Sequence, residues 1–169
     1  MALIVEDGSG VANANSFNTL AEIRAYATAR GATLGTDEAV EVFAILAMDY
    51  LASLEPRLKG RRTLFSQELI FPREFVYYIG YLSYPGYPDD EIPPQIKSAQ
   101  SQLVLEQHAG VPLMPTRVAQ PTLIRRKVGP IEREWSPGGE TITPYIPSVD
   151  ALLFNFLNSG VFTLRSVRV

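Results

Sequence analysis

The side chains that most often carry chemistry are scarce in this sequence. It contains no cysteine and one histidine, which excludes thiolate nucleophiles, disulfides and zinc sites built from cysteine and histidine. The histidine, His108, falls near the end of a predicted helix, where it more often interacts with the helix dipole than takes part in catalysis. Asp89, Asp90 and Glu91 could bind a hard cation, but acids ahead of a helix are more typically structural.

No catalytic motif accompanies these residues. The sequence has neither a G-x-x-x-x-G-K-[ST] phosphate loop nor a G-x-S-x-G nucleophile elbow. Glu132 and Glu134 fall on one face of a predicted strand, without neighbours that resemble a partnered site. We therefore predict that the protein is not an enzyme and that it uses no cofactor and no metal.

Basic and aromatic residues are better candidates for binding. Basic groups with aromatic platforms bind single-stranded nucleic acid, but the tyrosine-rich segment also holds three acids, and tyrosine is enriched at protein interfaces. We favour a protein interface for this segment and keep nucleic acid and an ordinary ordered loop as alternatives. The candidates for a subunit interface or a DNA channel are Arg57, Lys59, Arg61, Arg62, Arg73, Arg125, Arg126 and Lys127. The tyrosines of the candidate interface loop are Tyr77, Tyr78, Tyr81, Tyr84 and Tyr87.

Charge is unevenly distributed along the 169 residues. Residues 1–110 hold 8 Lys/Arg and 14 Asp/Glu, a net charge of -6, whereas residues 111–169 hold 7 and 4, a net charge of +3. The overall value of -3 argues against general nucleic-acid binding. An acidic body with a basic C-terminal part indicates head-to-tail self-association or an acidic partner, and chance unevenness is the alternative. No apolar run approaches the length of a membrane span.

Local signals predict a mainly α fold, a small bundle of about four helices. The first helix covers about residues 20–30, with a capping box from Thr19 and Glu22. The second begins after Thr36 and ends at Pro56, and it is apolar around most of its circumference, which indicates a central position in the core or a contact with another subunit. The third begins at Pro93–Pro94 and ends near Gly110.

The C-terminal third has a different pattern. A β-hairpin insertion is predicted near residues 117–136 with its turn at Gly129–Pro130, and a short fourth helix is predicted with Ser148 at its cap. We place one helical domain at residues 1–158 and an extended tail at residues 159–169.

The tail alternates apolar and basic residues without a helical period. Such a strand could add to the sheet edge of a partner, and pairing within its own chain is the alternative. The predicted partner-binding residues are Val161, Phe162, Thr163, Leu164, Arg165, Ser166, Val167, Arg168 and Val169.

The order of several segments resembles a known family. These are "MALIVEDGSGVANANSF", "LAEIRAYATARG", "EAVEVFAILAMDYL", "GRRTLFSQELIFPR", "EIPPQIKSAQSQLVLE" and the hairpin around "KVGPIEREW". The most specific parts are Gln67-x-Leu69-x-Phe71-Pro72-Arg73 and Ile92-Pro93. The family is encoded in structural gene clusters of tailed bacteriophages. Its members are often labelled DnaT-like single-stranded DNA-binding proteins and also look like head–tail connector, or adaptor, proteins.

This resemblance implies a structural virion protein made in the host cytoplasm and located at the head–tail junction. It implies a homo-oligomeric ring, a dodecamer, that lies under the portal protein, extends the channel for double-stranded DNA and meets the tail or a second connector. It also implies that the C-terminal tail binds the portal. A single-stranded DNA-binding protein of phage replication is the alternative.

Under this hypothesis residues 60–73 cross between the helices and a neighbouring subunit. Pro72 is expected to hold Phe71 extended, and Leu64, Leu69 and Phe71 are expected to pack on the helices. Arg61, Arg62 and Arg73 are expected to face a neighbour or the DNA channel. For Arg73 an ion pair with Glu68 or Glu74 is the alternative.

Overall fold

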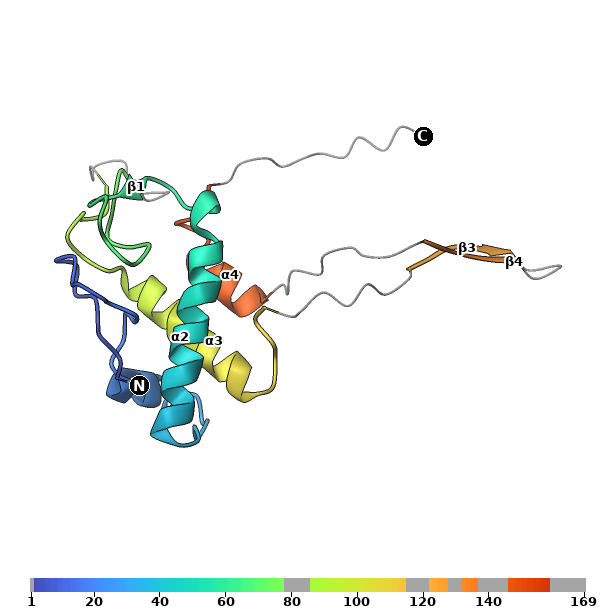
Figure 1. Ribbon diagram of the computed structural model, residues 1–169, viewed down its shortest axis with the longest axis horizontal. Coiled ribbons are helices and arrows are strands. Elements are labelled where there is room, and N and C mark those ends of the chain that lie inside the picture. Colours follow the sequence, from blue (N-terminus) through green and yellow to red (C-terminus); the bar gives the residue numbers. More distant parts are fainter. Residues whose placement is uncertain (1, 78–85, 115–121, 128–131, 137–145, 159–169) are drawn as a thin grey trace. The chain divides into compact units, whose positions relative to one another are not determined.

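The computed structural model describes residues 2–77, 86–114, 122–127, 132–136 and 146–158. The chain divides into two compact units: a helical body, formed from residues up to 113 and from 146 onward, and a hairpin unit, residues 114–145. Figure 1 shows the helices of the body and the two strands of the hairpin. The predicted class, mainly α with a small β-hairpin, is confirmed. The predicted tail, residues 159–169, lies outside the described residues.

Helix α1, Leu20–Thr28, begins where its capping box predicts. The backbone N–H of Thr19 donates to Oε2 of Glu22 at 2.6 Å, and the backbone N–H of Glu22 donates to the Thr19 hydroxyl at 3.2 Å. The helix ends two residues before Arg30, and Gly31 follows in the left-handed region at φ 74°. Both ends are therefore set by local chemistry.

Helix α2, Asp37–Ser53, is the longest in the described chain and crosses the front of the body in Figure 1. Thr36 caps it through a 3.5 Å bond from the backbone N–H of Ala39. A short 3-10 helix, η1 (Glu55–Arg57), continues the chain with Pro56 in its first turn, as expected of a residue that lacks a backbone N–H. The position of Glu55 at this break places its carboxylate beside the segment that follows.

Helices α3 (Pro94–His108) and α4 (Pro147–Leu153) complete the body. Pro94 opens α3 as predicted. The predicted cap of the fourth helix is wrong: Ile146 occupies the cap position, and Ser148 lies within the first turn. The Ser148 hydroxyl instead bonds to Oε1 of Glu106 on α3 at 3.1 Å. A tertiary contact therefore competes with local capping here.

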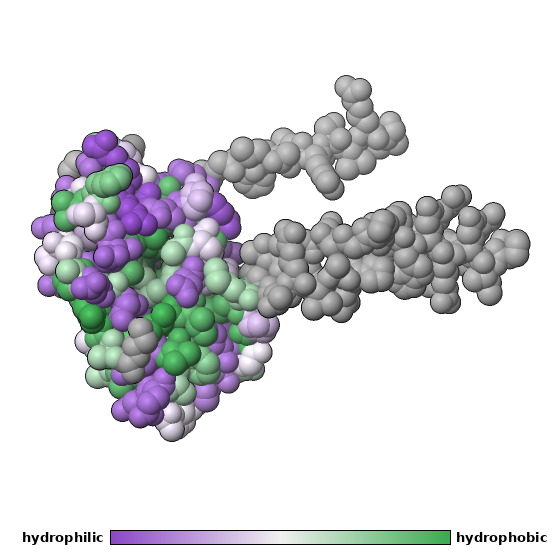
Figure 2. Space-filling model, viewed as in Figure 1, coloured by the Kyte–Doolittle hydropathy of each residue, from purple (hydrophilic) through white to green (hydrophobic). Residues whose placement is uncertain are grey.

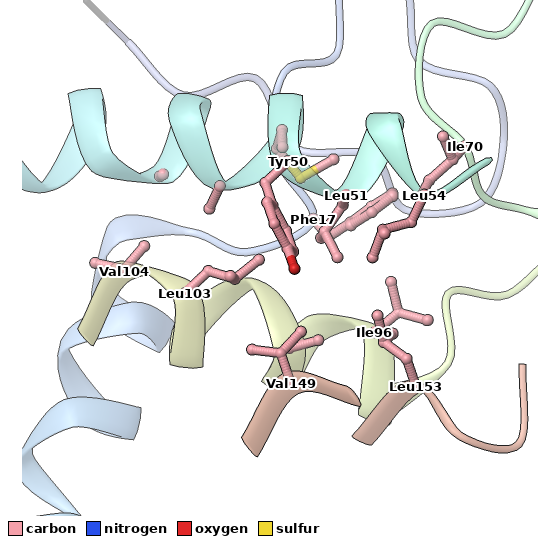
Figure 3. Packing of buried hydrophobic residues seen from close by; sticks show 14 of the residues in the cluster. Phe17, Tyr50, Leu51, Leu54, Ile70, Ile96, Leu103, Val104, Val149 and Leu153 are labelled. Atoms are coloured by element: carbon pink, nitrogen blue, oxygen red, sulfur yellow. The ribbon is translucent and has the colours of Figure 1, made fainter. Parts of the chain in front are cut away.

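The core lies where α2, α3 and α4 meet. Figure 3 shows Leu51 of α2, Leu103 of α3 and Val149 of α4 converging, and each is at most 1% exposed. Phe71, 1% exposed, packs edge-on against Phe17 and Phe156, with ring centroids 6.5 and 5.9 Å apart. The peptide bond between Phe71 and Pro72 is cis. This aromatic cluster joins three segments that are distant in sequence.

A buried polar contact attaches the N-terminal segment to α3. The side chain of Gln100 is fully buried, and its Oε1 accepts a bond from the backbone N–H of Phe17 at 3.0 Å. Its Nε2 donates to the Ser16 hydroxyl at 2.8 Å. A buried amide is costly unless its polar atoms are paired, so these bonds favour the observed position of the N-terminal segment on α3.

In the described part of the chain, four short strands form two sheets. Within the body, β1 (Arg61–Arg62) pairs antiparallel with β2 (Arg73–Glu74). In the hairpin unit, β3 (Thr122–Lys127) pairs antiparallel with β4 (Glu132–Ser136). The register of β3 and β4 shifts between Leu123 and Arg125, so Ile124 has no partner in it. The structure describes no helix that is both long and apolar enough for a bilayer span.

Candidate functional site

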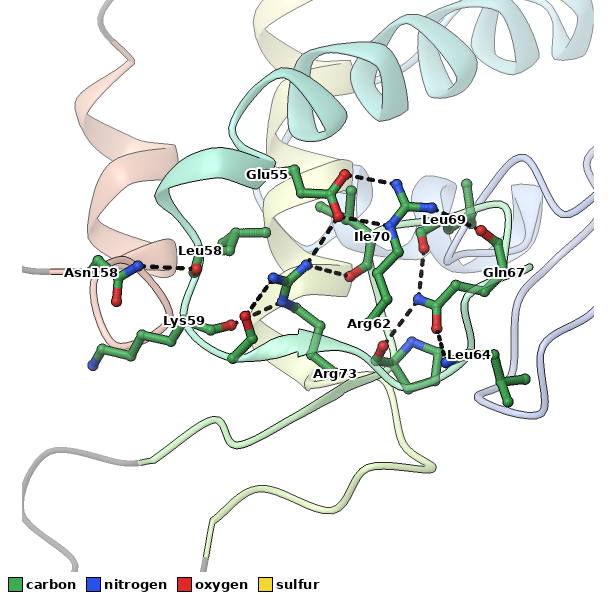
Figure 4. Close-up of polar contacts among 12 residues, drawn as sticks. Glu55, Leu58, Lys59, Arg62, Leu64, Gln67, Leu69, Ile70, Arg73 and Asn158 are labelled. Atoms are coloured by element: carbon green, nitrogen blue, oxygen red, sulfur yellow. Dashed lines mark hydrogen bonds and ion pairs between the residues drawn. The ribbon is translucent and has the colours of Figure 1, made fainter.

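A polar cluster that we call the Glu55 junction joins η1, the two strands of the small sheet and the loop between them. It consists of Glu55, Arg62, Gln67 and Arg73. Arg62 binds Glu55 with two nitrogens, Nε to Oε1 at 2.7 Å and Nη2 to Oε2 at 2.7 Å (Figure 4). Its Nη1 donates to the carbonyl of Gln67 at 2.8 Å. Two parallel charge-assisted bonds of this kind are among the strongest in proteins, so Arg62 is fixed in orientation.

Arg73 lies deeper in the same junction, and its side chain is only 5% exposed. Its Nε donates to the carbonyl of Lys59 and its Nη2 to that of Gly60, both at 2.9 Å. Its Nη1 lies 3.3 Å from both the Ile70 carbonyl and Oε1 of Glu55. The expectation that Arg73 faces outward is therefore wrong. The alternative ion pair exists, but its partner is Glu55 rather than Glu68 or Glu74.

The charges of the junction stabilise one another. The hydrogen bond from Arg62 is the main cause that lowers the pKa of the Glu55 carboxyl, and Arg73 lowers it further. The same bond raises the pKa of Arg62, whereas burial lowers the pKa of Arg73. An arginine remains protonated under such a shift. Glu55 is therefore held ionised at neutral pH, which suits a structural ion pair and not a proton donor.

Gln67 closes the loop between the two strands. Its Oε1 accepts a bond from the backbone N–H of Leu64 at 2.9 Å, and its Nε2 donates to the carbonyls of Leu69 at 2.8 Å and Pro72 at 3.0 Å. Leu69 and Phe71 pack on the core as expected, but Leu64 is 45% exposed, which corrects the prediction for that residue. The side-chain amide of Gln67 therefore holds the loop through bonds to its backbone, where the two-residue strands supply few.

The other edge of the segment holds the end of the helical body. The backbone N–H of Lys59 donates to the Phe156 carbonyl at 2.8 Å, and that of Asn158 donates to the Arg57 carbonyl at 2.7 Å. Nδ2 of Asn158 reaches the Leu58 carbonyl at 3.1 Å. We call this set of contacts the tail base, because Asn158 is the last described residue before the predicted tail. Backbone hydrogen bonds on both sides of Leu58 fix the position of Asn158.

Family membership follows from a comparison with known proteins. A family model described as "Putative DnaT-like ssDNA binding protein" matches residues 1–169. The chain belongs to this family. It matches no curated protein and no solved structure.

The surface of this family member beside the junction carries exposed aromatic residues. Arg61 is 71% exposed, bonds to Glu74 at 3.0 Å and lies 5.1 Å from the ring centroid of Phe75. Phe75 is 54% exposed and has a φ of 61°, a conformation that is a genuine outlier for a bulky residue. Phe65, in the loop between β1 and β2, is fully exposed. Exposed aromatic residues such as Phe65 and Phe75 are typical of contact surfaces.

Several predicted site residues have other positions. Tyr77 is exposed, but Tyr87 packs against the core ring of Phe156 at 6.4 Å, so it is a core-packing residue and not part of an exposed loop. Tyr78, Tyr81 and Tyr84 lie outside the described residues.

The remaining cations are divided between the two units. Lys59 donates from Nζ to the Asn155 carbonyl at 2.9 Å, and Arg57 is exposed. Arg125, Arg126 and Lys127 are consecutive on β3, and their roles stay predictions. The predicted tail residues 161–169 lie outside the described residues. No group of three possible metal ligands occurs in the described part of the chain.

Sequence reasoning did not identify Glu55, Asn158 and Phe75. Glu55 is the acid at the break between α2 and η1, and its position just ahead of a basic run was the available signal. The sequence held no signal for Asn158 or Phe75. Asn158 bonds to a carbonyl 100 residues away, and Phe75 has a left-handed backbone, and both features depend on the folded chain.

Proposed function

We propose that this protein is a structural subunit of the virion, a head–tail connector that acts by assembly. In this proposal copies of the chain form a ring beneath the portal protein, extend the DNA channel and meet the tail or a second connector. The C-terminal residues Val161–Val169 bind the portal.

The observation that carries the proposal is the tail base. The bonds that join Lys59 to Phe156, and Asn158 to Arg57 and Leu58, hold the end of the helical body against the segment that also contains the Glu55 junction. A segment that binds a partner transmits force and orientation only if its base is fixed to a rigid element. The tail base meets this requirement, and the exposed aromatic residues Phe65 and Phe75 provide contact area in the same segment.

The internal use of arginine favours assembly over nucleic-acid binding by the helical body. Arg62 and Arg73 bond to Glu55 and to backbone carbonyls, and Arg61 bonds to Glu74. Phosphate binding requires cations that are free to displace counterions from the nucleic acid. Arg62 and Arg73 are therefore poorly placed to bind a phosphate backbone.

Quantitative mass spectrometry of purified virions tests the proposal. The phage that encodes the chain is purified, and the copy number is measured against portal and capsid proteins as internal standards. A closed ring that matches the portal predicts about a dozen copies per particle. Absence from virions together with abundance in infected cells would sink the connector proposal.

Single-stranded DNA binding is the second candidate function. The description of the family favours it, and so does the run of three cations on β3. It predicts an affinity for a single-stranded oligonucleotide that falls steeply with salt and that depends on Arg125, Arg126 and Lys127. Fluorescence anisotropy that detects no binding at low salt would remove this candidate.

A further inference from the structure

One face of α2 has no partner in the described chain. Val42 is 52% and Leu46 43% exposed, and they are four residues apart, so they are neighbours on the helix surface. Figure 2 shows apolar residues gathered along the course of α2, between hydrophilic ones. Such a stripe on the longest helix is unusual unless another surface covers it.

Acidic residues continue this stripe at both ends. Glu38 precedes Val42 by four residues and Asp49 follows Leu46 by three, so all four share one line along the helix. We call this line the α2 outer face: Glu38, Val42, Leu46 and Asp49. Helix α2 contains four acids and no lysine or arginine. Glu38 and Asp49 form no ion pair within the described part of the chain. A partner for this face should be apolar and basic.

The hairpin has the complementary composition. Strands β3 and β4 together contain four basic and two acidic residues, a net charge of +2, and Leu123 lies opposite Trp135. The register also places Arg126 opposite Arg133. Like charges directly opposite in a two-stranded sheet are destabilising. A local feature that costs stability is expected where a partner compensates for it, and here an anionic surface would do so.

The hairpin needs a further surface for its own stability. It forms a compact unit of its own, and a two-stranded sheet alone is at best marginally stable in water. The lengths also agree. The α2 outer face spans about 16 Å from Glu38 to Asp49, and the six residues of β3 span about 17 Å.

We propose that the hairpin of one copy binds the α2 outer face of a second copy. This inference rests on the proposed assembly into a ring, because it names the two different faces that a head-to-tail contact requires. Acids at residues 38 and 49 meet the cations of the hairpin, and the apolar residues of both surfaces meet between them. Each subunit offers one hairpin and one α2 outer face. The same contact can therefore repeat from copy to copy until the ring closes.

Two charge-reversed full-length variants test this pairing. The first carries Glu38→Lys with Asp49→Lys on α2. The second carries Arg126→Glu with Arg133→Glu, which inverts the charge of the hairpin but keeps a like-charged pair in the same register, so the intrinsic stability of the sheet is matched. Circular dichroism checks that both fold. Self-association is measured by native mass spectrometry and by the fluorescence of Trp135, the single tryptophan of the chain.

We expect the wild-type protein to self-associate as its concentration rises. The dissociation constant for self-association of each variant should be higher by about tenfold or more. A 1:1 mixture of the two variants should restore association, because each then offers a face that complements the other. Contact of the hairpin with its own body would give no recovery on mixing. That result, association of the separate variants as strong as that of the wild type, or a monomeric wild type at all concentrations would overturn the inference.

The same variants separate this inference from the alternatives. If the hairpin variant loses affinity for single-stranded DNA while its self-association is unchanged, the hairpin binds nucleic acid and the inference fails. If virions contain the ring but the variants associate normally, the connector proposal stands and only this contact fails. If mixing restores association but virions lack the protein, the contact stands and the connector proposal fails.

Discussion

Nη1 of Arg73 lies 3.3 Å from Oε1 of Glu55, the same oxygen that accepts a 2.7 Å bond from Nε of Arg62. One carboxylate therefore pairs with two guanidinium groups, one of them buried, and the three side chains together keep a net charge of +1. Two cations of a run that resembles a nucleic-acid surface in the sequence, Arg62 and Arg73, are therefore used for internal contacts in the folded chain. The Glu55 junction connects the end of α2 to both strands of the small sheet.

Replacing Glu55 by glutamine should destabilise the protein. The amide keeps the shape but leaves the buried charge of Arg73 without a counterion, and loss of a bond to a charged group costs about 2 kcal/mol in the free energy of unfolding at pH 7. Urea denaturation measures this change. Glu91→Gln, at an exposed residue, is the matched control and should change the value by less than about 0.5 kcal/mol.

The same variant should also alter the dependence of stability on pH. The folded-state pKa of Glu55 lies below its ordinary value of 4.5, so its contribution is fully present above that value and is lost as the pH falls through the lowered pKa. The wild-type protein should therefore lose stability more steeply than Glu55→Gln as the pH falls below about 5. Parallel slopes for the two proteins in this range would show that the junction does not behave as described.

Gly60→Ala should be strongly destabilising. Gly60 has a φ of 67°, and an added Cβ would lie 2.0 Å from the Glu74 carbonyl oxygen, so the two strands could not keep their approach. The positive φ and the steric clash together predict a loss of about 2 kcal/mol or more in the free energy of unfolding. Gly35→Ala is the control, because its Cβ meets nothing within 4 Å. Equal melting temperatures for the two variants would contradict the close approach.

Phe75→Gly should weaken assembly without weakening the fold. Phe75 is exposed and has a left-handed backbone that costs a bulky residue about 1–3 kcal/mol, so glycine relieves strain while it removes the aromatic surface. We expect an unchanged or higher melting temperature together with weaker binding of the subunit to portal rings. Tyr77→Gly, at an exposed aromatic residue without a positive φ, should not gain stability. A large fall in the melting temperature of Phe75→Gly would instead give this ring a packing role.

Deletion of residues 161–169 should abolish portal binding and leave the body folded. The truncated chain retains Asn158 and its bonds to Arg57 and Leu58, so the tail base is intact. Pull-down with purified portal rings measures binding, and thermal unfolding measures the fold. A truncated protein that binds portal rings like the full chain would remove the tail from the proposed mechanism.

Elements governed by neighbouring residues could be predicted from the sequence alone. Thr19 with Glu22, Thr36, Pro56 and Pro94 act within one helical turn, and the helices begin and end where these residues indicate. Alternation around Gly129–Pro130 likewise located β3 and β4. The apolar spacing of the second helix indicated either a central position in the core or a contact with another subunit. The helix packs on α3 in the core, and a subunit contact through the exposed Val42 and Leu46 stays a prediction.

The tertiary structure decided the fate of the polar and charged residues. Nothing near Arg73 in the sequence distinguishes it from Arg61, yet one is 5% and the other 71% exposed, because Glu55 and three carbonyls converge only on the first. Ser148 similarly bonds across to Glu106 instead of capping its own helix. Hydrogen bonds and ion pairs act over a few ångströms whatever the sequence separation. The pattern of residue types along the chain therefore determined the helices. The packing of those helices then determined which cations remain available for a partner.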